Sequence, residues 1–429
     1  MGPVKLDQRV EGMSISPTLA ARVRSSSLVE EGQRVFRFGL GQSPFPVPEP
    51  LVAALRAAAA EKDYQPPGGL HELRRAVADH HRFRHGVAFA AEDIVIGPGS
   101  KELIFLLQLC FDGDILLPTP RWVSYVPQAR LAGRQVVTLP GGGRDGLTLE
   151  PERLAELCQA APGRRRLLFL NSPCNPTGLA STGEELEALA AVCREYQVVV
   201  LSDEIYAELR FSGRHRSLAQ LYPEATIVVS GLSKWCGAGG WRLGTMALPH
   251  GLRVLRRALE AVASETFSST SAPIQRAAVT AFKPQGEIEA YLVLVRRILA
   301  AALGWAAAEL DGVGLEVPQP VAGFYLFPGF APLRDALARL GIESDIDLSE
   351  RLLAETSVVT VPGSAFGCDP RALRVRLALV DFDGAHALTG LANGPADLSF
   401  LQRYLTPTWN GILALARWSA QLAPTRATP

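Results

Sequence analysis

Lys234 is the residue of this sequence whose chemistry is hardest to replace. The chain has only five lysines, at positions 5, 62, 101, 234 and 283, and arginine carries most of the remaining positive charge. Lys234 stands in the glycine-rich stretch SGLSKWCGAGGWRLG, just after an apolar run at 227–229. A desolvated lysine amine can attack a carbonyl carbon, which a guanidinium cannot do. Taken alone, however, Lys234 is explained equally simply as a solvated or acid-paired lysine at the end of a strand.

Asp203 favours the chemical interpretation of Lys234. It follows the apolar run at 198–201, so it holds the same place one predicted strand earlier. A carboxylate and a reactive amine at neighbouring strand ends suit pyridoxal phosphate. In that chemistry the lysine forms a Schiff base with the cofactor, and the acid keeps the pyridine nitrogen protonated. The two residues together therefore predict a site for this cofactor.

Other polar side chains follow the same apolar runs. Asn171 and Asn175 come after the run at 167–170, Tyr206 comes soon after Asp203, and Ser233 precedes Lys234. In open α/β sheets, ligands bind at the carboxyl ends of the strands. We therefore expect an amide, a carboxylate, a phenol and an amine to meet at one edge of the sheet.

Two glycine-rich stretches could bind phosphate. GPGSK, at 97–101, precedes a helix that we expect to begin near Ser100, so backbone N–H groups and the Ser100 hydroxyl could hold an anion there. The alternative is a glycine turn with a serine cap. GGGRDG, at 141–146, satisfies the dinucleotide pattern GxGxxG, but the next helix is expected only at Pro151. We interpret it as a surface turn.

Trp122 and the arginine pair Arg374 and Arg376 each allow two interpretations. Trp122 could be a core aromatic residue or could stack on a flat cofactor. The two arginines share one face of an alternating strand. They could be solvated, or one could bind a substrate carboxylate through two parallel hydrogen bonds. Strand alternation does not decide between them.

These residues require a parallel sheet to position them. The continuous apolar runs at 167–170, 198–201 and 227–229 are typical of strands that are covered on both faces. A helix is predicted between the first two, with Ser181 or Thr182 as its N-cap. Helical spacing then extends from about Leu252 to Leu310. After a Gly- and Pro-rich change of composition we expect a strand at GFYLF, a helix at LRDALARL and a strand at ALRVRLALV.

The predicted fold class is α/β, with two domains. We expect a large domain over 48–311, with a mostly parallel central sheet between helices. A smaller α+β domain is expected from residues 1–47 and 312–429.

Composition excludes several classes of protein. Lys+Arg and Asp+Glu are equal at 43 each, which gives no reason to expect a nucleic-acid partner. The six cysteines form no CxxC pair, so we expect neither disulfides nor a metal site. The N-terminus lacks the apolar core of a secretory signal. We also expect no membrane span, since charges or prolines interrupt the apolar runs, and we expect a cytoplasmic protein.

The chain resembles the class I/II aminotransferases, the fold-type I family of pyridoxal 5′-phosphate enzymes. The resemblance covers about residues 35 to 380. Its segments, in the family's order and at its approximate spacing, are FGLGQSPFPVPEPLVAAL, YQPPGGLHELRRAVADHH, GPGSKELI, PTPRWVSY, NSPCNPTG, SDEIY, SGLSKWCGAGGWRLG, GFYLF, VPGSAFG and RVRLAL. Each segment is a weak pattern, but together they are specific.

The resemblance implies a role for each candidate residue. Lys234 would be the Schiff-base lysine, Asp203 the partner of the pyridine nitrogen, and Tyr206 with Asn175 the partners of the ring's phenolic oxygen. Trp122 would stack on the ring. The phosphate would be bound by Ser100, Lys101, Ser233, Arg242 and, across a homodimer interface, Tyr64. The substrate α-carboxylate would be received by Gly41 and Arg376, which is the reason to prefer Arg376 to Arg374; Trp122 and Asn175 would also contact the substrate.

The resemblance predicts an L-amino acid:2-oxo acid aminotransferase with a ping-pong cycle. The alternative is another pyridoxal phosphate reaction on the same fold, namely a β-lyase, a cyclopropane-forming synthase or an amino acid oxidase. A DNA-binding regulator of the same fold is disfavoured, since too few residues precede the matching segments for a helix-turn-helix. The chain departs from the family pattern at Gly231, where many relatives have a phosphate-binding serine, and at Trp235 and Cys236. The segment after Asp381 extends beyond the usual ending and has no assigned role.

Overall fold

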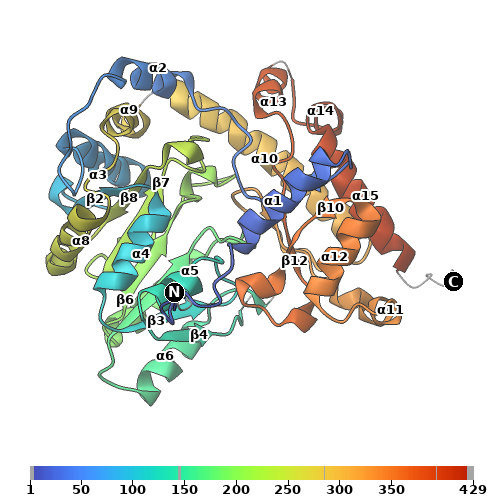
Figure 1. Cartoon of the computed structure of the whole chain (residues 1–429), viewed down its shortest axis with the longest axis horizontal. Coiled ribbons are helices and arrows are strands. Elements are labelled where there is room, and N and C mark those ends of the chain that lie inside the picture. Colours follow the sequence, from blue (N-terminus) through green and yellow to red (C-terminus); the bar gives the residue numbers. More distant parts are fainter. Residues whose placement is uncertain (1–3, 144–145, 285, 393, 423–429) are drawn as a thin grey trace.

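The computed structural model describes residues 4–143, 146–284, 286–392 and 394–422 of the 429-residue chain. Its central feature is a seven-stranded sheet in the order β2-β8-β7-β6-β5-β3-β4 (Figure 1). The strands are β2 (Ile94–Gly97), β3 (Asp114–Pro118), β4 (Val136–Leu139), β5 (Arg166–Asn171), β6 (Val199–Asp203), β7 (Thr226–Gly231) and β8 (Gly244–Ala247). Only β8 runs antiparallel to its neighbours β2 and β7. The mostly parallel sheet predicted from the sequence is confirmed.

The three apolar runs form the centre of this sheet, as β5, β6 and β7. Successive side chains of β5 enter different cores. Leu167 and Phe169 pack with the helices Ser100–Cys110, Tyr125–Leu131 and Arg253–Thr266. Leu168 and Leu170 pack with the helices Pro151–Ala160 and Gly183–Glu195. A strand that is covered on both faces has no solvent side, so its sequence is apolar throughout.

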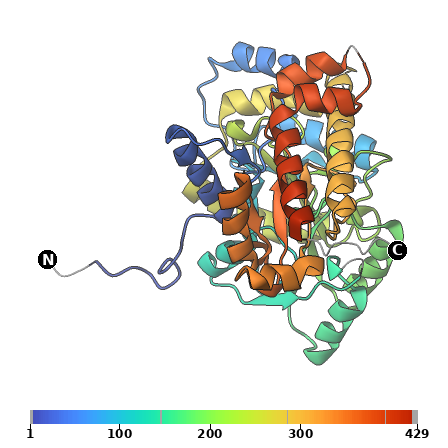
Figure 2. The same cartoon turned by 90° about the vertical axis from the view of Figure 1, so that its right-hand side faces the viewer.

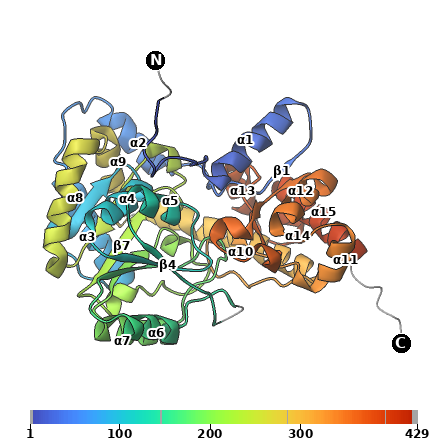
Figure 3. The ribbon, with the colours of Figure 1, turned by 60° about the horizontal axis from the view of Figure 1, so that its bottom comes forward.

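Helices cover both faces of the sheet (Figure 3). On one face lie α4 (Ser100–Cys110), α5 (Tyr125–Leu131) and α8 (Arg253–Thr266), and on the other lie α6 (Pro151–Ala160) and α7 (Gly183–Glu195). Thr182, rather than Ser181, caps α7: its side chain accepts a 3.2 Å hydrogen bond from the Glu185 N–H, and the Glu185 carboxylate accepts one from the Thr182 N–H. Beside β2 lie α2 (Glu49–Ala58), α3 (His71–His85) and α9 (Ala272–Phe282).

The C-terminal part of the chain builds two small sheets. One pairs β11 (Val361–Pro362) with β12 (Val375–Ala378) and β12 with β9 (Tyr325–Leu326), and the other pairs β1 (Phe36–Arg37) with β10 (Val358–Val359). Around them lie α1 (Pro17–Glu30), α11 (Arg334–Arg339), α12 (Asp345–Thr356), α13 (Gly384–Leu391), α14 (Leu398–Tyr404) and α15 (Thr406–Leu422). The described chain ahead of α1 begins away from the body of the molecule (Figure 2) and then meets it, where Arg130 Nη2 donates to the Gln8 and Glu11 carbonyls.

The predicted strands at GFYLF and ALRVRLALV are present but short. Pro328 follows GFYLF and has no N–H to extend the ladder beyond β9. Leu373, with a φ of 52°, stands in the left-handed region and ends β12 on its N-terminal side. Strands β9 and β12 therefore pair only over the short ranges given above.

The helix α10 (Gly286–Gly312) bears on the expectation that no segment spans a membrane. It is long and apolar enough to cross a membrane by length and composition, although Arg296 and Arg297 interrupt it. Its buried residues, which include Ile288, Leu299 and Leu303, pack in the main core, and Figure 2 shows α10 alongside α15. This is the environment of a core helix.

Candidate active site

Lys234 lies in the loop between β7 and β8, and its amine points back into the protein. Nζ donates a 2.8 Å hydrogen bond to the carbonyl oxygen of Gly41 and lies 5.9 Å and 5.8 Å from the ring centroids of Tyr206 and Phe324. Burial, and after it the nearby Arg376 guanidinium, lower the pKa of this amine to about 8, while the Asp203 carboxylate opposes both. At pH 8 about half of the amines are unprotonated and nucleophilic.

Asp203 closes β6 at the same edge of the sheet. Its Oδ2 accepts a 2.6 Å hydrogen bond from the Tyr125 hydroxyl, and Oδ1 accepts one of 3.3 Å from the Ile205 N–H. Burial raises the pKa of the carboxyl to about 6 in spite of these two donors. In register, Asp203 stands between Asn171 of β5 and Val229 of β7. The predicted convergence of the three strand ends is therefore present.

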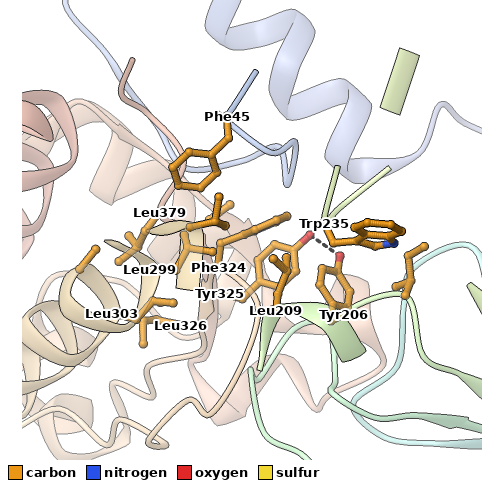
Figure 4. Close-up of a cluster of buried hydrophobic side chains, with 14 of the residues drawn as sticks. Phe45, Tyr206, Leu209, Trp235, Leu299, Leu303, Phe324, Tyr325, Leu326 and Leu379 are labelled. Atoms are coloured by element: carbon orange, nitrogen blue, oxygen red, sulfur yellow. Dashed lines mark hydrogen bonds between the residues drawn. The ribbon is translucent and has the colours of Figure 1, made fainter. Parts of the chain in front are cut away.

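Tyr206 and Tyr325 form the floor beside Lys234. Their hydroxyl groups are 2.9 Å apart and fully inside the core, next to Phe324 and Trp235 (Figure 4). A Cβ at Gly41 would lie only 1.8 Å from the Tyr325 hydroxyl oxygen. Only glycine at position 41 lets the backbone carbonyl approach the amine while Tyr325 keeps its place.

Arg376 and Arg374 have different environments. Arg376 is 1% exposed, and its guanidinium lies 4.7 Å from the ring centroid of Tyr325 and 5.1 Å from that of Phe366. Its Nη1 donates to Asn175 Oδ1 at 3.2 Å and its Nη2 to the Gly39 carbonyl at 2.5 Å. Its Nε is buried and has no acceptor among the described residues.

Arg374, in contrast, is already engaged. Its Nη2 pairs with Glu316 Oε2 at 3.0 Å, and Nη1 donates to the Phe327 carbonyl at 3.3 Å. A buried donor left unpaired costs about 1–3 kcal/mol, so the free Nε of Arg376 suits an acceptor that arrives with the substrate. Burial and hydrogen-bond partners therefore distinguish two arginines that the strand pattern left equivalent.

The glycine turn at the N-terminus of α4 brings backbone N–H groups close to the Arg242 guanidinium. Gly99 has a φ of +95°, and a Cβ there would lie 2.2 Å from Arg242 Nη2; a Cβ at Gly244 would lie 2.3 Å from the Ser100 backbone nitrogen. Arg242, with a φ of 55°, folds over this turn and donates to the Gly239 and Pro98 carbonyls. Backbone N–H groups, a helix N-terminus and a guanidinium together fit an anion.

Lys101 and Trp122 lie close to this turn. The Lys101 amine lies 5.2 Å from the centroid of the Trp122 ring, and burial together with the Arg242 charge lowers the Lys101 pKa. Trp122 is half-buried, and its ring is roughly perpendicular to that of Tyr125, with the two centroids 5.3 Å apart. A half-buried aromatic ring, an anion-binding turn, a buried acid and a half-buried lysine together fit a phosphorylated pyridine ring.

One expected residue lies apart, and two were missed. Tyr64 is 91% exposed and contacts none of the groups above. Tyr125 and Tyr325 bond to Asp203 and Tyr206, yet sequence reasoning gave them no role. Tyr125 stands in PTPRWVSY and Tyr325 in GFYLF, two of the segments that resemble the family. That resemblance was the signal that could have pointed to these two tyrosines. In GGGRDG, Arg144 and Asp145 lie outside the described residues, while Gly142 bridges Thr148 in an ordinary antiparallel turn.

Comparison with known proteins identifies the family. The model of "Aminotransferase class I and II" matches residues 33–387. The aspartate aminotransferase of Bacillus subtilis is 32% identical over 385 residues, which cover 87% of this chain and 95% of that protein. The aspartate/prephenate aminotransferase of Thermus thermophilus is 31% identical, covering 84% of this chain and 91% of its own.

Solved structures agree. The aspartate aminotransferase from Thermus thermophilus, solved with maleate, superposes with a TM-score of 0.82 at 28% identity and covers 97% of this chain and all of that one. Most of the segment after Asp381 therefore has a counterpart there. The protein of this sequence belongs to the class I and II aminotransferases, the fold-type I enzymes that use pyridoxal 5′-phosphate to move an amino group from an amino acid to a 2-oxo acid.

Proposed function

We propose that Lys234 is the residue that carries pyridoxal 5′-phosphate and moves the substrate proton in this aminotransferase. The observation that carries the proposal is the half-buried amine with a pKa of about 8, placed beside Asp203 and Arg376 at one sheet edge. When bound, the cofactor supplies an aldehyde for the amine and a ring that takes up electrons from the substrate's Cα–H bond.

The other residues would hold the cofactor. Ser100, Lys101, Ser233 and Arg242 would bind its phosphate at the α4 N-terminus. Asp203, ionised above about pH 6, would hold the pyridine nitrogen protonated, and the Tyr125 hydroxyl keeps that carboxylate oriented. The remaining contacts would come from Tyr206 and Asn175 at the phenolic oxygen and from Trp122 on the ring face.

Arg376 would position the substrate. Its guanidinium is fixed by Asn175, Gly39 and the two flanking aromatic rings, so a carboxylate can bind without reordering the side chain. Gly41, which has no side chain, lets the backbone come close to the position of this carboxylate, and Trp122 and Asn175 would line the same substrate position. With the α-carboxylate fixed, Lys234 Nζ would accept the proton that leaves Cα and later return it.

The substrate class follows from the relatives. Those with the most extensive matches are named aspartate or aspartate/prephenate aminotransferases, so we propose aspartate as the first amino donor to test. Screening amino acids by the spectrum of the holoenzyme, with aspartate set against an uncharged isostere such as asparagine, would measure this preference.

The experiment that tests the site compares Lys234→Ala with Lys283→Ala, a change of an exposed lysine paired with Glu72. Lys234→Ala should lose both the visible absorbance of the bound cofactor and turnover, whereas Lys283→Ala should keep both. Retention of turnover in Lys234→Ala would refute the assignment. Recovery of the cofactor in its amine form after adding amino acid alone distinguishes transamination from the other pyridoxal phosphate reactions.

We propose a homodimer in which Tyr64 reaches the phosphate site of the other subunit. Its 91% exposure in the single chain supports a role outside its own subunit. In mixtures of Lys234→Ala and Tyr64→Ala chains, one site of each mixed dimer would regain both residues. Activity should then exceed the sum of the two parents; strictly additive activity would contradict shared sites.

We also propose that the chain is cytoplasmic and that it divides into domains at 48–311 and at 1–47 with 312–429. Support for the division comes from β1, which pairs with β10 at Phe36↔Val358 and so joins the N-terminal segment to the C-terminal part. Residues 1–3, 144–145, 285, 393 and 423–429 of these ranges lie outside the described residues.

A further inference from the structure

Four of the seven histidines gather away from the cofactor site, on the far side of Trp235. His80, His81 and His85 stand on the last turns of α3, and His215 lies across from them, with its ring 5.5 Å from that of His85. Glu208 reaches this cluster from the short helix Ala207–Leu209. Sequence reasoning looked for metal ligands among the cysteines and expected no site; these ligand types come from two segments far apart in the chain.

We propose that His80, His85 and Glu208 bind a divalent transition-metal ion of the zinc type, with water as the fourth ligand. His80 Nε2 lies 3.1 Å and His85 Nε2 lies 3.2 Å from Glu208 Oε1, and all three atoms lie within 4.8 Å of one another. A tetrahedral ion with bonds of about 2.0–2.1 Å separates neighbouring ligands by about 3.3 Å. The distances from Glu208 Oε1 to the two histidine nitrogens are therefore close to the distances between neighbouring ligands of a metal site.

The same distances also suit two imidazole N–H groups that donate to one carboxylate oxygen. What favours a metal is the way the carboxylate is held. Its other oxygen, Oε2, accepts from Arg84 Nη2 at 2.6 Å and from Arg296 Nη2 at 3.3 Å, which leaves Oε1 to face the imidazoles. A ligating carboxylate is typically oriented in this manner by outer hydrogen bonds.

The surrounding charges also permit a cation. Arg84 and Arg296 are offset by Glu208 and Glu289, to which both arginines bond. Glu204, beside His215 at 3.0 Å, adds a further buried carboxylate.

Space for an ion and its water exists on both sides of Glu208. A cavity of about 320 Å³ is lined by His85, Glu208 and His215, and another of about 380 Å³ is lined by His80, Glu208 and Trp235. Both open toward solvent, which gives an entry path. The metal would tie α3 to the segment that carries Asp203 and Tyr206, since Glu208 follows Tyr206 by two residues.

Titration of the metal-free holoenzyme with Co²⁺ tests the proposal, because four-coordinate Co²⁺ absorbs visibly at wavelengths longer than the cofactor does. We expect one equivalent per chain, displacement by Zn²⁺ with loss of that absorbance, and a higher melting temperature with the metal bound. His80→Ala and His85→Ala should each lower affinity more than about 100-fold, since even outer-shell changes cost 10–100-fold.

His250→Ala is the matched control, because His250 is an exposed histidine whose ring forms a hydrogen bond with Arg253. It should bind Co²⁺ as the unaltered protein does. The titration of the unaltered holoenzyme does not depend on the folding of any variant. Absence of stoichiometric binding there, or binding that persists in both His80→Ala and His85→Ala, would overturn the proposal.

Discussion

The Lys234 amine donates its hydrogen bond to the carbonyl of Gly41, 193 residues earlier in the chain. Two residues before that, the Gly39 carbonyl accepts from Arg376. The segment 39–41 thus presents alternate carbonyls to the two cations that the proposed reaction needs, the amine and the carboxylate-binding guanidinium. Movement of this segment would displace both together.

The lowered pKa of Lys234 predicts how cofactor loading depends on pH. An ordinary lysine becomes nucleophilic only near pH 10, but burial lowers the pKa here to about 8. The rate at which apoprotein combines with pyridoxal 5′-phosphate should therefore rise up to about pH 8 and level off above it, as followed by absorbance in stopped flow. A rate that still rises tenfold per pH unit at pH 9 would show that the pKa of the Lys234 amine is not lowered.

Arg376→Gln removes the second cause of that depression and should move the break to higher pH. It should also raise KM for carboxylate substrates about 100-fold, since a charge-assisted hydrogen-bonded pair is lost. Arg374→Gln is the matched change nearby: it breaks a hydrogen bond to the Phe327 carbonyl and a pair with the half-exposed Glu316, the pair being worth at most about 1 kcal/mol. Equal effects of the two changes on KM would contradict the assignment.

Asp203→Asn should stabilise the apoprotein at the expense of function. The folded carboxyl has a pKa of about 6 against 3.8 unfolded, so its contribution to stability is present below pH 3.8 and lost as pH rises through 6. Above pH 6 the buried charge costs about 3 kcal/mol, which asparagine avoids. Urea unfolding of both apoproteins should show that the difference in their free energies of unfolding grows from pH 4 to pH 7, and Asp203→Asn should be inactive. A difference that does not depend on pH would show that the buried charge of Asp203 is not its cause.

Gly231→Ser should not supply the phosphate contact of the relatives. A Cβ at Gly231 would lie 2.6 Å from the Leu243 carbonyl and 3.0 Å from the Gly244 Cα, across the β7–β8 pair. We expect a loss of about 1–3 kcal/mol in unfolding free energy and no tighter cofactor binding. Gly240→Ala, in the same loop but with open space around it, should be near neutral. Tighter cofactor binding by Gly231→Ser would contradict this prediction, because it would show that β7 and β8 can move apart to make room for the serine.

The sequence by itself determined the sheet and the chemistry that stands at its edge. Continuous apolar runs can be buried on both faces only in a covered parallel sheet, so β5, β6 and β7 and the polar residues after them followed directly. The turn at 97–101 and the helix from Ser100 followed in the same way from glycine and capping rules. These features depend on neighbours in the chain, which a sequence pattern contains.

Only the tertiary structure shows how the environments of two similar side chains differ. Arg374 and Arg376 stand two residues apart on one strand, and their difference arises from Glu316, Asn175 and two aromatic rings on other segments. The pKa of Lys234 and the gathering of His80, His85 and Glu208 likewise depend on burial and on contacts between distant segments. Desolvation and pairing are properties of the packed interior, so local spacing in the sequence does not encode them in readable form.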